Sequence, residues 1–96
     1  MIKPTIGRVV WFWNAPGLQI QPEAAIICYV HDDTHVNLVV FDMDGNPQPK
    51  SSVFLYQGEG ERPSGLPGTF CEWMPYQIGQ VAKTEELQKQ ITKAKV

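Results

Sequence analysis

The sequence predicts an all-β fold, a small five-stranded barrel followed by a short C-terminal α-helix. The chain has only 96 residues, which is enough for one hydrophobic core. Its apolar residues come in short runs, and eight Gly and eight Pro supply turns between them. The runs are rich in β-branched and aromatic residues, which favour strands.

The first three predicted strands come before residue 42. Residues 7–13, Gly-Arg-Val-Val-Trp-Phe-Trp, are apolar on both faces of a strand, and residues 14–17, Asn-Ala-Pro-Gly, end the run. Residues 24–30 form the second run. A polar turn at residues 31–34 separates it from the third, residues 36–41, so these two runs predict a hairpin.

The last two predicted strands are shorter. Residues 42–47 contain Asp-Gly, which supplies the positive φ of a tight turn. Residues 52–56 follow two prolines, so the fourth strand should begin at an edge or a bend. Residues 57–69 hold four Gly and two Pro and predict a mobile loop. The fifth strand covers residues 69–74 and ends at Pro75.

The spacing of apolar residues changes near the C-terminus from that of strands to that of a helix. We therefore predict a barrel domain in residues 1–82 and a C-terminal helix in residues 83–96. Thr84 is a suitable N-cap. The residues spaced i, i+4, i+7 on one helix face are Leu87, Ile91 and Ala94. Because isolated helices this short rarely persist, the apolar face should dock on the barrel or on a second copy. We expect a homo-oligomer.

The charges exclude several partners. The net charge is -2, and because four Lys and two Glu give residues 83–96 a charge of +2, residues 1–82 carry -4. Such a chain has too few cations to bind duplex nucleic acid. It shows neither an apolar run long enough for a membrane span nor a signal peptide, so we expect no membrane partner and an intracellular location. There Cys28 and Cys71 should be reduced thiols buried in apolar strands.

Residues with catalytic or metal-binding chemistry are scarce. His31 and His35 flank Asp32 and Asp33, which in principle could ligate a metal, but a solvated hairpin tip accounts for the cluster. The Asp-x-Asp-Gly of residues 42–45 lacks the later ligands of a calcium loop. The sequence therefore predicts no enzyme, no metal and no cofactor.

The aromatic side chains are more informative. Trp11 and Trp13 share one face of the first strand, because side chains two apart point the same way. At least one should lie at a barrel mouth or on the surface, because smaller side chains are expected to fill the interior. Those are Val9, Ile26, Cys28, Val30, Leu38, Val40 and Val53. Trp73 and Tyr76 flank Pro75, whose fixed φ should present both rings.

Together with nearby cations and amides, these rings predict a platform on which a flat polar ligand stacks. The predicted ligand-binding residues are Arg8, Trp11, Trp13, Trp73, Tyr76, Gln77 and Lys83. The pattern favours a small nucleotide over a nucleic-acid strand. Two alternatives stay open: the tryptophans fill the core, or they form a protein interface.

The order of these motifs resembles known proteins. The Gly-Arg-Val-Val-Trp start, Ala-Ala-Ile-Ile, Val-Asn-Leu-Val-Val-Phe-Asp and the Asp-Gly turn are similar to the beginning of a Src-homology-type or Tudor-type barrel. With Glu-Trp-Met-Pro-Tyr-Gln at residues 72–77 and a charged tail, nearly the whole chain resembles small proteins of tailed bacteriophages. The resemblance implies a phage origin and a binding module, and it implies no activity.

We therefore expect a non-enzymatic phage protein that sequesters a small nucleotide-like signal of host defence in the host cytoplasm, at sites completed between subunits. The alternative is a virion structural or assembly protein, whose aromatic patch and C-terminal helix dock on other phage proteins. A single-stranded nucleic-acid binder is the third possibility.

Overall fold

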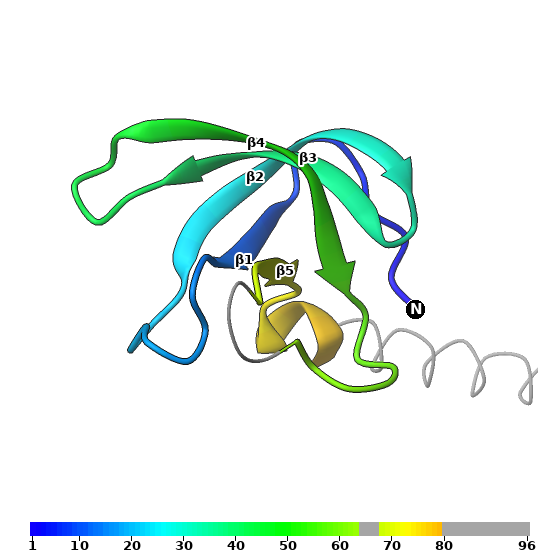
Figure 1. Cartoon of the computed structure of the whole chain (residues 1–96). Helices are drawn as coiled ribbons and strands as arrows, with labels where there is room; N and C mark the ends of the chain where they lie inside the picture. The colour runs from blue at the N-terminus through cyan, green and yellow to red at the C-terminus, as the bar shows by residue number, and fades with distance from the viewer. Residues whose placement is uncertain (64–67, 80–96) are drawn as a thin grey trace, which may run out of the picture.

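A computed structural model describes residues 1–63 and 68–79, and in this part of the chain five strands close into a barrel followed by a short helix (Figure 1). The strands are β1 (Val9–Trp13), β2 (Glu23–Asp32), β3 (His35–Phe41), β4 (Pro47–Tyr56) and β5 (Phe70–Glu72). Neighbouring strands are antiparallel except β4 and β5, which are parallel. The predicted fold class is confirmed. The helix predicted in residues 83–96 lies outside the described residues.

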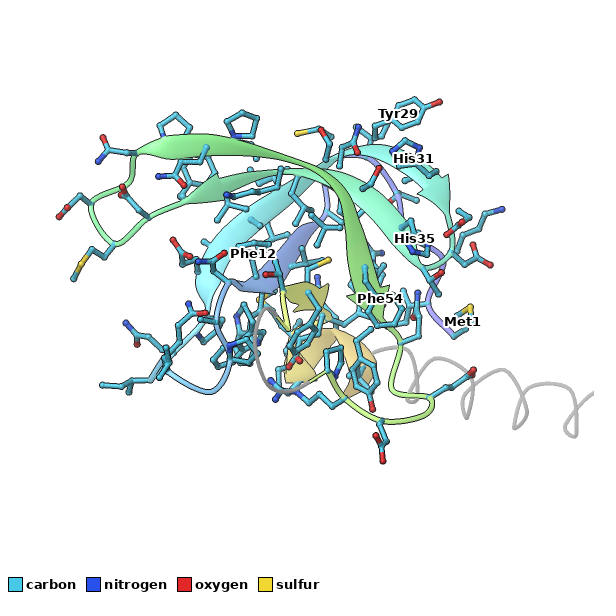
Figure 2. All side chains as sticks on the ribbon, in the orientation of Figure 1. Met1, Phe12, Tyr29, His31, His35 and Phe54 are labelled. Atoms are coloured by element: carbon cyan, nitrogen blue, oxygen red, sulfur yellow. The ribbon has the colours of Figure 1, made fainter. Side chains whose placement is uncertain are left out.

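The core lies under an arch formed by β2, β3 and β4, with β1 and β5 closing the barrel below (Figure 1). Figure 2 shows Phe12 inside the barrel, whereas Tyr29 and His31 lie on its outer surface. The side chains of the core cluster are Val10, Phe12, Ala25, Ile27, Val36, Leu38, Val40, Val53, Leu55, Cys71 and Trp73. No helix in this part of the chain is long and apolar enough to cross a membrane.

The predicted interior was right for β3 and β4, where Leu38, Val40 and Val53 are buried, and wrong for β1 and β2. Val9 and Cys28 are exposed and Ile26 is half-buried, while Val30 packs against the core from its margin. Neighbouring residues on both strands are apolar, so alternation alone did not decide which face points inward. A bulge between Ile27 and Tyr29 also shifts the alternation of inward-facing and outward-facing side chains along β2.

β4 begins five residues earlier than predicted, at Pro47. Among the described residues its first half pairs only with β3, because β5 pairs with β4 only at Leu55 and Tyr56. Proline lacks the N–H that a further strand would need, so an edge of this kind accommodates both Pro47 and Pro49. The long strand bends where the β3–β4 register shifts, next to Ser52.

Candidate functional site

The candidate site begins beside Trp73, which follows β5 and belongs to the barrel core with 2% of its surface exposed. The guanidinium carbon of Arg8, the residue before β1, lies 5.8 Å from the centroid of the Trp73 ring. This is the geometry of a cation–π contact. Because Trp73 is buried and Arg8 is exposed, the indole holds a positive charge in place at the surface.

Gln57, the first residue after β4, fixes the position of Trp73. Its side-chain oxygen accepts hydrogen bonds from Trp73 Nε1 at 2.9 Å and from the backbone N–H of Ile2 at 3.2 Å. Its side-chain nitrogen donates to the backbone oxygens of Ile2 and Asp33, both at 2.8 Å. The sequence assigned Gln57 only to a loop. Its partners are far away along the chain, so no local pattern indicated this role.

The helix that carries Tyr76 covers residues 75–79, where the sequence predicted only a bend. The preceding strand is shorter than predicted and ends at Glu72. Proline is favourable at the first position of a helix, since its missing N–H is not needed there and its φ is already helical. Pro75 therefore begins a helix in this chain.

Gln77 ties the helix to β1. Its Oε1 accepts the backbone N–H of Met74 at 2.9 Å, which satisfies a donor at the helix start as the Glu or Gln at position N3 of a capping box does. Its Nε2 donates to the backbone oxygen of Val9, also at 2.9 Å. Both ends of the Gln77 amide are thus engaged within the chain, and they fix Tyr76 relative to Arg8.

An open hollow of about 500 Å³ lies between the start of β1 and this helix. Arg8 supplies its positive charge, and Tyr76, 72% exposed, supplies an aromatic ring. The other lining residues are Thr5, Ile6, Gly7, Val9, Met74 and Gln77. The volume lies in the range of ligand pockets, about 300–1,000 Å³. A fixed cation beside an exposed ring suits a flat anionic ligand.

Trp11 and Trp13 lie on the outer face of β1, opposite Glu72 and Phe70 of β5, and are half-buried. Arg62 covers this face: its guanidinium carbon lies 5.2 Å from the Trp13 ring centroid and 5.0 Å from that of Phe70. Its Nε donates to Glu72 Oε2 at 2.9 Å. Trp13 Nε1 is buried and has no hydrogen-bond partner among the described residues. We call this group the outer aromatic cluster.

The sequence placed both tryptophans of the outer aromatic cluster on one face but did not include Arg62. One feature of the sequence could have indicated its role: Arg62 is the only basic residue of the acidic loop at residues 57–69. A cation there has two natural contacts, a carboxylate and an aromatic face. Which carboxylate and which ring it meets depends on how β5 returns beside β1.

The structure brings four of the seven predicted residues together. These are Arg8, Trp73, Tyr76 and Gln77. The expectation that both rings flanking Pro75 are presented was wrong for Trp73, because its N–H finds a buried partner and its ring packs in the core. Trp11 and Trp13 do not line the hollow. Lys83 lies outside the described residues.

The two histidines lie exposed on the β2–β3 hairpin. His31 Nε2 donates to Asn37 Oδ1 at 2.9 Å, and His35 Nδ1 lies 3.1 Å from Asp32 Oδ1. The backbone N–H of Thr34 also donates to Asp32, and this bond, followed by the contact with His35, lowers the pKa of the Asp32 carboxyl. Across residues 1–63 and 68–79, no three His, Cys, Asp or Glu side chains converge to hold a metal ion.

The two cysteines differ in environment. Cys71 is buried on β5, and burial raises the pKa of its thiol to about 12. The prediction that both thiols are buried was wrong for Cys28, which is exposed on β2 at the bulge. Only Cys28 is therefore open to solvent-borne reagents.

A comparison of the chain with protein-family models, with curated proteins and with solved structures finds no match.

Proposed function

We propose that this chain is a non-enzymatic binding protein that captures a small anionic ligand with an aromatic ring, as nucleotides have, in the hollow between Arg8 and Tyr76. One observation carries the proposal: Trp73 and Gln77 fix a cation and an exposed ring on the two sides of one ligand-sized hollow. The guanidinium would pair with a phosphate and the phenol ring would stack on the base.

The open shape of the hollow bears on the subunit arrangement. Small-molecule sites usually enclose most of their ligand, whereas this hollow faces solvent in a single copy. We propose that a second subunit completes the site. The resemblance to bacteriophage proteins extends the proposal further: the ligand would be a nucleotide-like signal of host defence, held intact in the host cytoplasm.

The experiment is a calorimetric and thermal-shift titration of the full chain with a panel of linear and cyclic nucleotides. We expect at least one to bind with a Kd of about 1 µM or below. Arg8→Ala should weaken this binding by about tenfold or more through the lost charged hydrogen bonds, and Tyr76→Ala should do the same through lost stacking. Tyr76→Phe keeps the ring and should retain most of the affinity.

Matched controls are Lys50→Ala and Tyr29→Ala, which remove a cation and an exposed ring elsewhere on the barrel and should leave the Kd unchanged. Denaturing the complex should release the nucleotide intact. Release of a cleaved nucleotide would show an enzyme instead. The proposal fails if no nucleotide of the panel binds.

A second candidate function is that of a virion or assembly protein, which the outer aromatic cluster favours. Trp11, Trp13 and Arg62 are the residue types that dominate protein interfaces, and they lie together on one face of the barrel. Sedimentation of the protein with intact virions, and its loss from them in an Arg62→Ala, Trp13→Ala variant, would support this function. A protein found only in the soluble fraction of infected cells would exclude it.

A further inference from the structure

A groove of about 510 Å³ separates the loop after β1 from the β3–β4 turn. Figure 1 shows both segments on the left of the view, away from the helix at residues 75–79. The apolar lining consists of Leu18, Ile20, Pro22, Ala24, Phe41 and Met43. Ile20, Met43 and Leu18 are 101%, 95% and 76% exposed, the highest values among large apolar side chains in the described chain. Apolar side chains gathered in this way mark an interaction surface.

Both walls of the groove are held in shape by their own hydrogen bonds. On the β3–β4 turn, Asp42 Oδ1 accepts the backbone N–H groups of Asp44 and Asn46, both at 2.9 Å. In the loop after β1, Gln19 Oε1 accepts the backbone N–H of Ala15 at 2.7 Å. The exposed side chains therefore stand on preformed turns, so a partner would not have to order them.

The charge around the groove indicates the kind of partner. Glu23 and Asp42 line it, Asp44 lies on the same turn, and neither Lys nor Arg is among the lining residues. A partner should therefore combine a short apolar stripe with basic side chains.

We propose that the groove binds residues 84–96 of a second copy of this chain. The sequence of this segment predicts a helix with Leu87 and Ile91 on one face, and Lys89, Lys93 and Lys95 follow the first turn. The two large apolar side chains are one turn apart, so both can enter one groove, and the lysines match its acidic rim. The segment also needs a partner surface, since a helix of this length is marginal alone.

The topology favours a second copy over the same copy. β5 runs parallel to the end of β4, and the helix at residues 75–79 follows it, whereas the groove lies at the beginning of β4. Eight residues of β4, about 26 Å measured along the bent strand, lie between its start at Pro47 and its pairing with β5 at Leu55. The four residues from Gln80 to Lys83 span only about 14 Å when extended. If each copy gives its segment to the other, a closed two-fold dimer forms and the buried area doubles.

Light scattering after size exclusion, across a dilution series of the full chain, tests the proposal. We expect a dimer that dissociates on dilution. A tail variant, Leu87→Asp with Ile91→Asp, and a groove variant, Ile20→Asp with Met43→Asp, should each raise the dimer Kd by about tenfold or more. The groove positions are almost fully exposed, so the groove variant should fold normally. Tyr29→Asp, an exposed position outside the groove, should change nothing.

Mixing the two variants provides the decisive result. The groove variant retains an intact tail and the tail variant an intact groove, so an equimolar mixture should recover one of the two contacts and form dimers that neither variant forms alone. This recovery also shows that both variants are folded. A wild-type chain that stays monomeric at every concentration would overturn the proposal and would indicate that residues 84–96 dock within their own copy or on a different protein. A dimer whose Kd is the same in the groove variant would overturn the proposal as well.

Discussion

The side chain of Gln57 accepts the indole N–H of Trp73 at 2.9 Å, and the same side chain bonds two further segments that are distant along the chain. The same amide is bonded to Ile2, the second residue of the chain, through both its oxygen and its nitrogen, and to Asp33 on the β2–β3 turn. All four hydrogen-bonding positions of one side chain are occupied. Since Trp73 lies under Arg8, the network supports the candidate site as well as the core.

Replacing Gln57 by Ala should lower the free energy of unfolding by about 2–4 kcal/mol. The change leaves the buried N–H of Trp73 without a partner and removes the bonds to Ile2 and Asp33. Urea unfolding monitored by tryptophan fluorescence measures the loss. Gln48→Ala is the matched control, because Gln48 is exposed on β4, and it should cost less than about 0.5 kcal/mol. Equal effects of the two changes would show that the network adds no stability.

Two adjacent serines should respond to glycine in opposite directions. Ser52 has a φ of 52°, in the left-handed region that disfavours side chains, and its backbone N–H donates to Asn37 Oδ1 at 2.8 Å. Ser52→Gly keeps this bond and removes the strain, so it should raise the free energy of unfolding by about 0.5–1 kcal/mol. Ser51→Gly, in ordinary strand conformation, should lower it by a similar amount. Chemical denaturation of both variants gives the signs, and destabilisation by Ser52→Gly would contradict the argument.

The number and order of the strands could be predicted because short apolar runs alternate with turn residues, as at Asp44-Gly45. The start of β4 could not, because proline normally counts against a strand and only the missing neighbour on one side makes Pro47 and Pro49 acceptable. The inward face of β1 was predicted wrongly, because Val9 was expected in the interior and is exposed. Val10 and Phe12 are buried, whereas Trp11 and Trp13 lie on the outer face, and because all four side chains are apolar no local pattern indicates which pair points inward.

The candidate site was predictable in composition and only partly in geometry. Arg8 and Tyr76 were chosen as a cation and a ring flanking a proline bend, and they do line one hollow. The ring of Trp73 was expected to be exposed beside them. It was assigned wrongly because its buried partner, Gln57, comes from a loop whose contacts depend on the closed barrel.

The two thiols should react at different rates in the native protein. Cys28 is exposed, whereas Cys71 is buried with a pKa raised to about 12, so its thiol stays protonated as well as inaccessible. An aromatic disulfide reagent at neutral pH should modify one thiol per native chain and two after unfolding in urea. Cys28→Ala should abolish the native reaction. Two fast-reacting thiols in the native protein would contradict the burial of β5.

Acid should weaken the β3–β4 turn through Asp42. The backbone N–H and the side-chain amide of Asn46 donate to this carboxylate, with a further bond from the backbone of Asp44, and they lower the pKa of Asp42 below its ordinary value of 3.8. Because the native state favours the ionised form, this contribution to stability is present above about pH 4 and is lost as the pH falls through the lower native pKa. Asp42→Asn should therefore reduce the free energy of unfolding at pH 7 and flatten its decline toward pH 3, as urea titrations at a series of pH values would show. Asp44→Asn removes a carboxylate from the same turn and keeps these bonds, so it should preserve the decline; an unchanged decline in Asp42→Asn would mean that the acid dependence originates elsewhere.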